Sequence, residues 1–364
     1  MIKQKILIAT GGTGGHVFPA YSLANYFIKK NYNIKLTVDR RGFKYLEKYK
    51  QINLTKIFSS PLSKKNIISF LFSILMICYS FLISFVFLLF NRPSLILGMG
   101  GYSSFPICIA ASVLRIKFII YENNLIVGKA NKYLLPFANK MIVSYKELEG
   151  VPDKYKYKIL EIGNIIREEI LNFNFTKSTV EEINNLKILV LGGSQGAKVF
   201  AEKLPSVFKK LKNSGIQFKI FQQCRKYQFD NLTDLYTKLD LDYELFNFTD
   251  KIIDYYHKSN IVITRSGASV LGELINFKIP FISIPLPTSA DNHQYKNAKF
   301  YMKKGYGFLI KEKDIDDRLC DLLSNINKEK LTLERIILKQ KQYSDKDIFK
   351  KLNFLMKEIL NEKN

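Results

Sequence analysis

The stretch Ile6–Pro19, ILIATGGTGGHVFP, decides the fold of this chain. An apolar run ends in two glycine pairs separated by Thr13, His16 follows at once, and a helical pattern starts near Pro19. Glycine permits positive φ angles and lets a ligand approach the main chain closely. Free N–H groups at a helix start attract anions. The stretch therefore predicts a buried strand, a tight loop and an anion-binding helix N-terminus; the alternative is an ordinary glycine-rich turn.

Strand and helix signals alternate along the rest of the chain, which is typical of doubly wound α/β domains. A second run, ILVLGGSQGA at 188–197, repeats the first pattern after a polar stretch that follows Gly163, so we place a domain boundary there. Ser266 is the expected N-cap of a helix within RSGASVLGEL at 265–274. The expected strands are Lys5–Ala9, Ile34–Val38, Leu95–Leu97, Phe118–Tyr121, Lys140–Val143, Phe218–Gln222, Tyr243–Phe246, Ile261–Thr264, Phe281–Ile284 and Gly307–Ile310.

Composition narrows the classes of partner. The 364 residues carry a net charge of +24, which favours nucleic acid, acidic lipid surfaces or phosphorylated substrates. Dispersed basic residues without a nucleic-acid-binding module argue against nucleic acid. The four cysteines form no CxxC motif and are read as buried, reduced thiols of a cytosolic protein. Only three histidines occur, so a His-rich metal site is excluded.

Residues 67–90 contain no charge over 24 residues, and by length they qualify as a transmembrane helix. A span would place the first glycine loop and LGMGG at 97–101 on opposite sides of a membrane, although both loops read as parts of one domain. Four serines form one helical stripe suited to close packing: Ser69, Ser73, Ser80 and Ser84. We expect a helix docked on the domain with its outer face in the bilayer; a buried core helix and a true span are the alternatives.

Two further motifs follow strands, so they lie at the carboxyl edge where open α/β sheets bind ligands. One is LGMGGY, ending at Tyr102; the other is YENN at 121–124, with Glu122 and Asn124. Neither GGTGGH nor GGSQGA fits the dinucleotide fingerprint or the phosphate-loop pattern, which argues against a dehydrogenase or a P-loop enzyme. No paired-carboxylate metal motif such as DxD stands out, Asp39 reads as structural, and we expect no essential metal and no cofactor.

The motifs GGTGGHVFP, LGMGGY, GGSQGA, RSGA and DNHQY occur in the order seen in a known family. The chain resembles the bacterial peptidoglycan N-acetylglucosaminyltransferases, which convert the first lipid-linked intermediate into the second. The resemblance implies two Rossmann-like domains facing a cleft, 1–162 plus 345–364 and 163–344, in the two-domain glycosyltransferase B type. It implies inverting β-1,4 transfer from UDP-N-acetylglucosamine to undecaprenyl-diphosphate-linked N-acetylmuramoyl pentapeptide. The enzyme would be peripheral on the cytoplasmic face of the inner membrane, with an anionic membrane surface and other cell-wall synthesis proteins as partners.

The resemblance also implies roles for single residues. His16 matches a histidine proposed to assist proton transfer, a structural capping role being the alternative, and Glu122 is the second catalytic candidate. Tyr121 and Asn123 depart from the family's His-Glu-Gln-Asn, which weakens any role given to the first position. The acceptor side is expected at Gly11, Gly12, Gly100, Gly101 and Tyr102. The donor contacts are expected at Thr13, Gly14, Gly15, Asn124, Arg167, Ser194, Thr249, Ala268, Ser269, Val270, Leu271, Gly272, Glu273 and Gln294.

Two other functions fit the same pattern. One is a related glycolipid glycosyltransferase with another sugar or a diacylglycerol acceptor, against which the pair GGTGGHVFP and LGMGGY argues. The other is a non-catalytic nucleotide-sugar-binding membrane scaffold, which would have lost His16, Arg167 or Glu273. All three residues are present.

Overall fold

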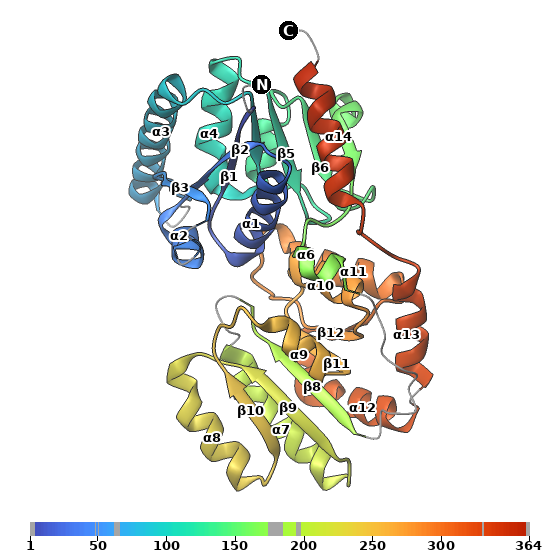
Figure 1. Ribbon diagram of the computed structural model, residues 1–364. Helices are drawn as coiled ribbons and strands as arrows, with labels where there is room; N and C mark the ends of the chain where they lie inside the picture. The colour runs from blue at the N-terminus through green and yellow to red at the C-terminus, as the bar shows by residue number, and fades with distance from the viewer. Residues whose placement is uncertain are drawn as a thin grey trace. The chain divides into compact units, whose positions relative to one another are not determined.

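Continuous apolar runs form the strands of two parallel sheets, as expected for strands covered on both faces. The computed structural model describes residues 4–47, 49, 51–61, 66–173, 185–193, 198–329 and 331–361. These fall into two compact units, Met1–Glu168 with Asp345–Asn364, and Glu169–Ser344. The predicted fold class, α/β with two doubly wound Rossmann-like units, is confirmed (Figure 1).

The first unit contains a seven-stranded sheet of order β3-β2-β1-β4-β5-β6-β7. Apolar residues from β1, β4, β5 and β6 and from the helices beside them form its core. Its elements are β1 (Lys5–Thr10), α1 (Gly14–Lys29), β2 (Asn33–Val38), α2 (Arg40–Leu46), β3 (Asn53–Lys56), α3 (Ile67–Phe90), β4 (Leu95–Gly98), α4 (Gly101–Val113), β5 (Phe118–Glu122), α5 (Lys129–Leu134), β6 (Lys140–Val143), β7 (Ile159–Glu161) and α14 (Ile348–Asn361), with α6 (Glu168–Leu171) at the boundary.

The second unit contains a six-stranded sheet of order β10-β9-β8-β11-β12-β13. Its core lies between β8, β9, β11 and the amphipathic helices α7 and α12. Its elements are β8 (Leu186–Leu191), α7 (Lys198–Asn213), β9 (Phe218–Gln223), α8 (Phe229–Lys238), β10 (Asp242–Phe246), α9 (Ile252–Lys258), β11 (Ile261–Thr264), α10 (Ala268–Phe277), β12 (Phe281–Ser283), α11 (His293–Lys303), β13 (Phe308–Leu309), α12 (Ile315–Lys328) and α13 (Leu331–Lys341).

Strand order reverses at the same place in both sheets. In the first unit β1 lies between β2 and β4, and in the second β8 lies between β9 and β11. Connections from the two central strands leave in opposite directions there, so a crevice opens at their carboxyl ends. The loops after β1 and β4 are the two glycine motifs of the first unit. The topology thus places both motifs at the usual ligand position of this fold.

Two predicted helix starts are wrong. The first helix begins at Gly14 rather than near Pro19, because the carbonyl of Thr13 already accepts the backbone N–H groups of His16 and Val17. Glycine has a weak intrinsic helix propensity, so the sequence pattern hides this first turn. The helix after β11 has Gly267, not Ser266, at its N-cap position, and Ser266 is fully buried. The short strands β3 and β7 were not predicted.

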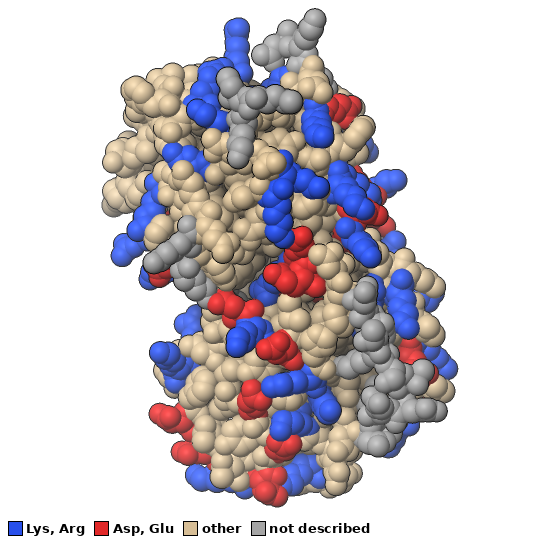
Figure 2. All heavy atoms as spheres, in the orientation of Figure 1, with Lys and Arg blue, Asp and Glu red and all other residues tan. Residues whose placement is uncertain are grey.

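The apolar helix α3 packs on the first unit by one narrow stripe, which excludes a wholly buried core helix. Ser73, Ser80, Ser84 and Leu88 are its buried residues, and α4 lies beside it (Figure 1). Ser69 is only partly buried, and Cys78, expected inside, is exposed. The large exposed apolar side chains are Ile67, Ile68, Leu71, Phe72, Ile74, Leu75, Tyr79, Leu82, Val86, Leu89 and Phe90. Figure 2 shows this surface as an area largely free of charged residues.

Candidate functional site

The first glycine loop is shaped by a buried carboxylate. Gly11 and Gly12 have φ angles of 153° and 79°, which L side chains rarely adopt. A Cβ atom on Gly11 would lie 2.6 Å from Oδ1 of Asp39 and from Oγ of Ser103. No side chain fits at position 11, so glycine is required there for close packing as well as for its backbone angle.

Asp39, at the end of β2, joins three pieces of the first unit. Its Oδ1 accepts hydrogen bonds from the backbone N–H of Gly12 (2.9 Å) and of Gly42 (2.7 Å), and its Oδ2 accepts one from the Tyr102 hydroxyl (2.8 Å). The carboxylate is only 4% exposed. Burial, followed by the hydrogen bond and charge of Asp39, raises the pKa of Tyr102 to about 12, while Arg41 and Ser103 oppose the shift. Both glycine loops are therefore tied to one side chain.

His16 lies in the first turn of α1 against the second glycine loop. Its Nδ1 is 3.0 Å from the carbonyl oxygen of Met99. A carbonyl oxygen only accepts, so Nδ1 carries the proton, and Nε2 of the neutral ring is then the nitrogen that can accept one. Cβ atoms placed on Gly100 and Gly101 would lie within 3.4–3.6 Å of the imidazole ring. The two glycines thus leave room for the ring, and the Met99 carbonyl sets its tautomer.

Glu122 ends β5 and organises the loop that follows. Its Oε1 accepts from the backbone N–H and side-chain amide of Asn124 (3.1 and 3.0 Å). Its Oε2 accepts from the Gly128 N–H (2.9 Å) and the Asn131 amide (3.0 Å). The side chain is 4% exposed. With four donors around a buried carboxylate, the geometry suits a residue that positions Asn124 better than one that exchanges protons.

Tyr121 has a defined place although it departs from the family motif. Its hydroxyl is 3.1 Å from Oγ of Ser144 and accepts the backbone N–H of Ile165 at 3.0 Å. Burial is the main cause that raises the pKa of this phenol. Two residues after Ile165, the guanidinium of Arg167 lies 5.1 Å from the centre of the Phe18 ring on α1. Tyr121 therefore fixes the backbone that carries Arg167.

In the second unit the predicted nucleotide residues Ala268 to Glu273 form the first turns of α10. The helix starts after Gly267, and its first N–H groups have no side-chain cap at that position. Glu273 is 8% exposed, and its Oε2 accepts a hydrogen bond from the Tyr256 hydroxyl at 3.0 Å. This bond fixes the rotamer of the carboxylate one and a half turns into the helix.

The other predicted donor residues of this unit lie on loops after strands and on α11. Oγ1 of Thr249 accepts the Lys251 N–H at 3.1 Å after β10. Oε1 of Gln294 accepts the Leu286 N–H at 2.9 Å, which links α11 to the loop after β12. Ser194 lies outside the described residues. Within the described part of the chain, no group of three or more His, Cys, Asp or Glu side chains has an arrangement that could hold a metal ion.

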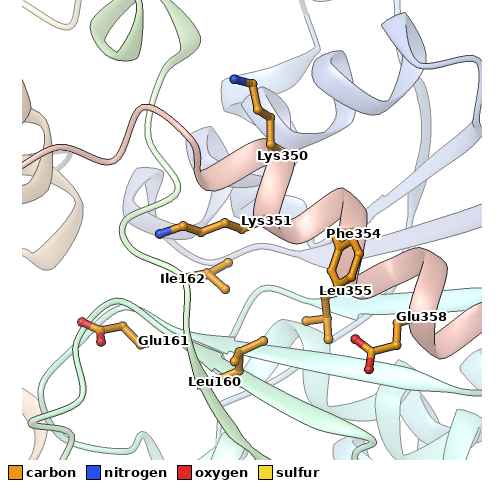
Figure 3. Close-up of a pocket in the computed structure, with 8 residues that line it drawn as sticks. All are labelled: Leu160, Glu161, Ile162, Lys350, Lys351, Phe354, Leu355 and Glu358. Carbon is orange, nitrogen blue, oxygen red and sulfur yellow. The ribbon is translucent and has the colours of Figure 1, made fainter.

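A surface hollow of about 540 Å³ lies elsewhere on the first unit, between β7 and α14. Figure 3 shows Leu160 and Ile162 on one wall and Leu355 on the other, with charged side chains around them. None of the predicted site residues lines it. β7 is the outermost strand of the sheet, far in strand order from the reversal at β1 and β4, so this hollow is separate from the candidate site.

Comparisons with known proteins give a consistent result. The Glycosyltransferase family 28 N-terminal domain matches residues 6–143 and the Glycosyltransferase family 28 C-terminal domain matches residues 187–352. A UDP-N-acetylglucosamine–N-acetylmuramyl-(pentapeptide) pyrophosphoryl-undecaprenol N-acetylglucosamine transferase of Pelagibacter ubique is 35% identical over 99% of this chain and 100% of its own length. The protein of the same name from Rickettsia canadensis is 36% identical over 88% of this chain and 91% of its own.

Solved structures agree on the fold. The crystal structure of Acinetobacter baumannii MurG superposes with a TM-score of 0.79 at 22% identity, covering 98% of this chain and 99% of that one. A co-structure of S. aureus MnaA with UDP superposes with a TM-score of 0.70 at 14% identity, covering 99% of each chain. At such identities the likeness concerns the fold alone.

Proposed function

The chain belongs to the family of UDP-N-acetylglucosamine–N-acetylmuramyl-(pentapeptide) pyrophosphoryl-undecaprenol N-acetylglucosamine transferases. From that membership we infer which of its residues bind the donor, which bind the acceptor and which transfers the proton. It is a glycosyltransferase of peptidoglycan synthesis that uses UDP-N-acetylglucosamine. It moves N-acetylglucosamine to the muramoyl pentapeptide on undecaprenyl diphosphate, converting lipid I to lipid II.

We propose that His16 is the general base of this transfer. The acceptor hydroxyl oxygen attacks the anomeric carbon on the face opposite to UDP, the carbon–oxygen bond to UDP breaks, and the configuration inverts. Nε2 takes the hydroxyl proton, because Nδ1 is already committed to the Met99 carbonyl. This committed tautomer is the observation that supports the assignment most directly. Glu122 then acts as a positioning residue for Asn124.

The donor nucleotide binds the second unit in this proposal. The N-terminus of α10 stabilises the charge that develops on the departing diphosphate, as helix N-termini do for anions. Glu273, held by Tyr256, accepts hydrogen bonds from the ribose hydroxyls. Thr249 contacts the uracil through its backbone, and Gln294 contacts the sugar. Arg167 and Ser194 contribute diphosphate and nucleotide contacts, and Thr13, Gly14 and Gly15 lie near the donor sugar.

The lipid acceptor reaches the first unit from a membrane surface, and we propose α3 as the contact. By length and composition α3 could cross a bilayer, but the strands it connects, β3 and β4, belong to one sheet. Docking along the interface buries its exposed apolar face without dividing that sheet. At its carboxyl end, Nζ of Lys35 lies 4.9 Å from the centre of the Phe87 ring and donates to Asn91, so a cation borders the apolar surface.

One experiment tests the function and the base together. Purified protein is incubated with labelled UDP-N-acetylglucosamine and a short-chain lipid diphosphate carrying N-acetylmuramoyl pentapeptide. We expect one sugar transferred per UDP released, and strongly reduced turnover in His16→Ala and Glu273→Ala. Full activity in both variants would refute the site while leaving the function in place. UDP binding without turnover by the wild-type protein would refute the function.

A further inference from the structure

Asp39 and Tyr102 form a hydrogen-bonded pair at the place where both glycine loops meet. Asp39 is the last residue before α2 and Tyr102 is the second residue of α4, so 63 positions separate them in the chain. A Cβ atom on Gly12 would lie 3.7 Å from Cε1 of Tyr102, which places the ring directly against the first loop. Tyr102 is only partly buried, so part of this residue remains accessible to a ligand.

The direction of this hydrogen bond is fixed by chemistry. An ionised carboxylate has no proton to give, so the Tyr102 hydroxyl is the donor at 2.8 Å. The single proton of the Tyr102 hydroxyl is then engaged with Asp39, so toward any other group the hydroxyl oxygen can only accept a hydrogen bond. A ligand that meets this oxygen must bring a hydrogen, from a sugar hydroxyl or an amide N–H. An ionised phosphate oxygen has none and would be repelled.

We propose that Asp39 is a positioning residue that fixes the Tyr102 hydroxyl as a hydrogen-bond acceptor for a hydroxyl or amide group of the lipid-linked muramoyl peptide. The inference rests on the proposed function, because it assigns a recognition contact to the same acceptor side. It also assigns different parts of the acceptor to different protein groups. Tyr102 binds the sugar or peptide part, and the diphosphate binds to other residues.

Asp39→Asn separates this role from loop support. The amide oxygen can take the place of Oδ1, which keeps the bonds from Gly12 and Gly42, and asparagine is as good an N-cap as aspartate. The amide nitrogen then faces Tyr102 and donates to it. The phenol proton then points toward the ligand, where the Tyr102 O–H and the donor group of the ligand face each other without an acceptor between them. Exposed Asp153, paired with Lys156 at 2.7 Å, supplies the matched control Asp153→Asn.

Steady-state kinetics use the short-chain muramoyl-pentapeptide diphosphate and UDP-N-acetylglucosamine. We expect Asp39→Asn to raise the KM for the acceptor about tenfold, which corresponds to about 1.4 kcal/mol, while the KM for UDP-N-acetylglucosamine and the melting temperature stay near those of Asp153→Asn. In a Tyr102→Phe background the same substitution should add nothing to the acceptor KM. An equal effect in both backgrounds, an unchanged acceptor KM, or an equal rise in both KM values would overturn the proposal.

A second readout does not depend on turnover. Tyrosine labelled with ¹³C at Cζ gives a Tyr102 signal that Tyr102→Phe identifies, and its titration midpoint should fall in Asp39→Asn because the neighbouring negative charge is lost. An unchanged midpoint would show that Asp39 does not control this hydroxyl. If the wild-type protein transfers no sugar, the proposed function fails; if it transfers sugar and Asp39→Asn behaves like the control, only this inference fails.

Discussion

At the scale of single residues, backbone carbonyls and buried carboxylates decide which side chains are chemically available. The Met99 carbonyl accepts a hydrogen bond from Nδ1 of His16, so Nε2 is the ring nitrogen that can take a proton. Four donors surround the carboxylate of Glu122 and occupy it fully. The sequence pattern offered both residues as catalytic candidates. Their surroundings favour His16 for proton transfer and Glu122 for positioning Asn124.

His16→Gln tests the base directly, because glutamine keeps a polar side chain of similar length but cannot take a proton near neutral pH. We expect kcat to fall by about 10²–10⁴-fold, the usual contribution of general base catalysis. The loss of rate at low pH that reports protonation of the base should also disappear. Dissociation constants for UDP, measured by calorimetry, should stay within about twofold. A variant with unchanged kcat would contradict the role of His16.

Glu122→Gln places an amide NH₂ group against two hydrogen-bond donors inside the protein. We expect the free energy of unfolding to fall by about 1–3 kcal/mol, the cost of unsatisfied buried donors. Turnover should fall as well, but the pH dependence of the remaining activity should match that of the wild type. Urea unfolding and a pH–rate profile provide the measurements. A change in the shape of the profile would favour Glu122 as the base instead.

Tyr121→Phe removes the hydroxyl that accepts the Ile165 N–H inside the protein. Ile165 is 1% exposed and Ser144 is 1% exposed, so water does not replace the missing partner. We expect a loss of about 1–3 kcal/mol in the free energy of unfolding, measured by urea denaturation. Tyr157→Phe is the matched control, since Tyr157 is 71% exposed and should change stability by less than about 0.5 kcal/mol.

The sequence predicts single residues well only where a local motif marks them. His16 follows the glycine loop after β1 and Glu122 ends β5, both inside recognisable motifs, and both lie at the carboxyl edge as expected. The contacts of Asp39 could not be predicted from the sequence, because its partners Gly12 and Tyr102 are 27 and 63 positions away. The departure from the family motif at Tyr121 weakens any catalytic role for that position. The structure gives Tyr121 a different role, because its hydroxyl accepts the backbone N–H of Ile165, 44 positions further along the chain.

At the scale of elements, α3 has two faces with opposite requirements. Ser80 is fully buried, and its hydroxyl donates to the Met76 carbonyl, whereas Leu75 on the opposite side is 67% exposed. The serine stripe was predicted from its spacing, and Ser73, Ser80 and Ser84 are buried with Leu88, whereas Ser69 is only partly buried. Helix limits were harder to predict where glycine or proline occurs, as at Gly14, because such residues weaken the local pattern.

Leu75→Glu and Ser80→Leu should therefore change different properties: the first membrane binding, the second stability. Leu75→Glu removes apolar area from the exposed face, so binding to vesicles should fall while the melting temperature stays near that of the wild type. Ser80→Leu overfills a packed contact and should cost about 1–3 kcal/mol in stability. Vesicle co-sedimentation and thermal unfolding measure the two effects. A Leu75→Glu variant that binds vesicles as tightly as the wild type would contradict the proposed contact.

At the scale of the whole molecule, the net charge of +24 should make membrane binding electrostatic as well as apolar. We expect stronger binding to vesicles with anionic lipid than to zwitterionic ones. The difference should shrink as salt shortens the Debye length from about 10 Å at 0.1 M to about 3 Å at 1 M. Release of the protein by carbonate would agree with docking, and retention in the membrane fraction would favour a span.

The central claim is the transfer itself, and one assay tests it most directly. Purified full-length protein is given UDP-N-acetylglucosamine labelled in the sugar, with the short-chain diphosphate-linked N-acetylmuramoyl pentapeptide in one reaction and a diacylglycerol acceptor in another. We predict label in a disaccharide–pentapeptide product, one sugar per UDP released, and none on diacylglycerol. UDP binding without labelled product, or transfer to diacylglycerol alone, would contradict the claim.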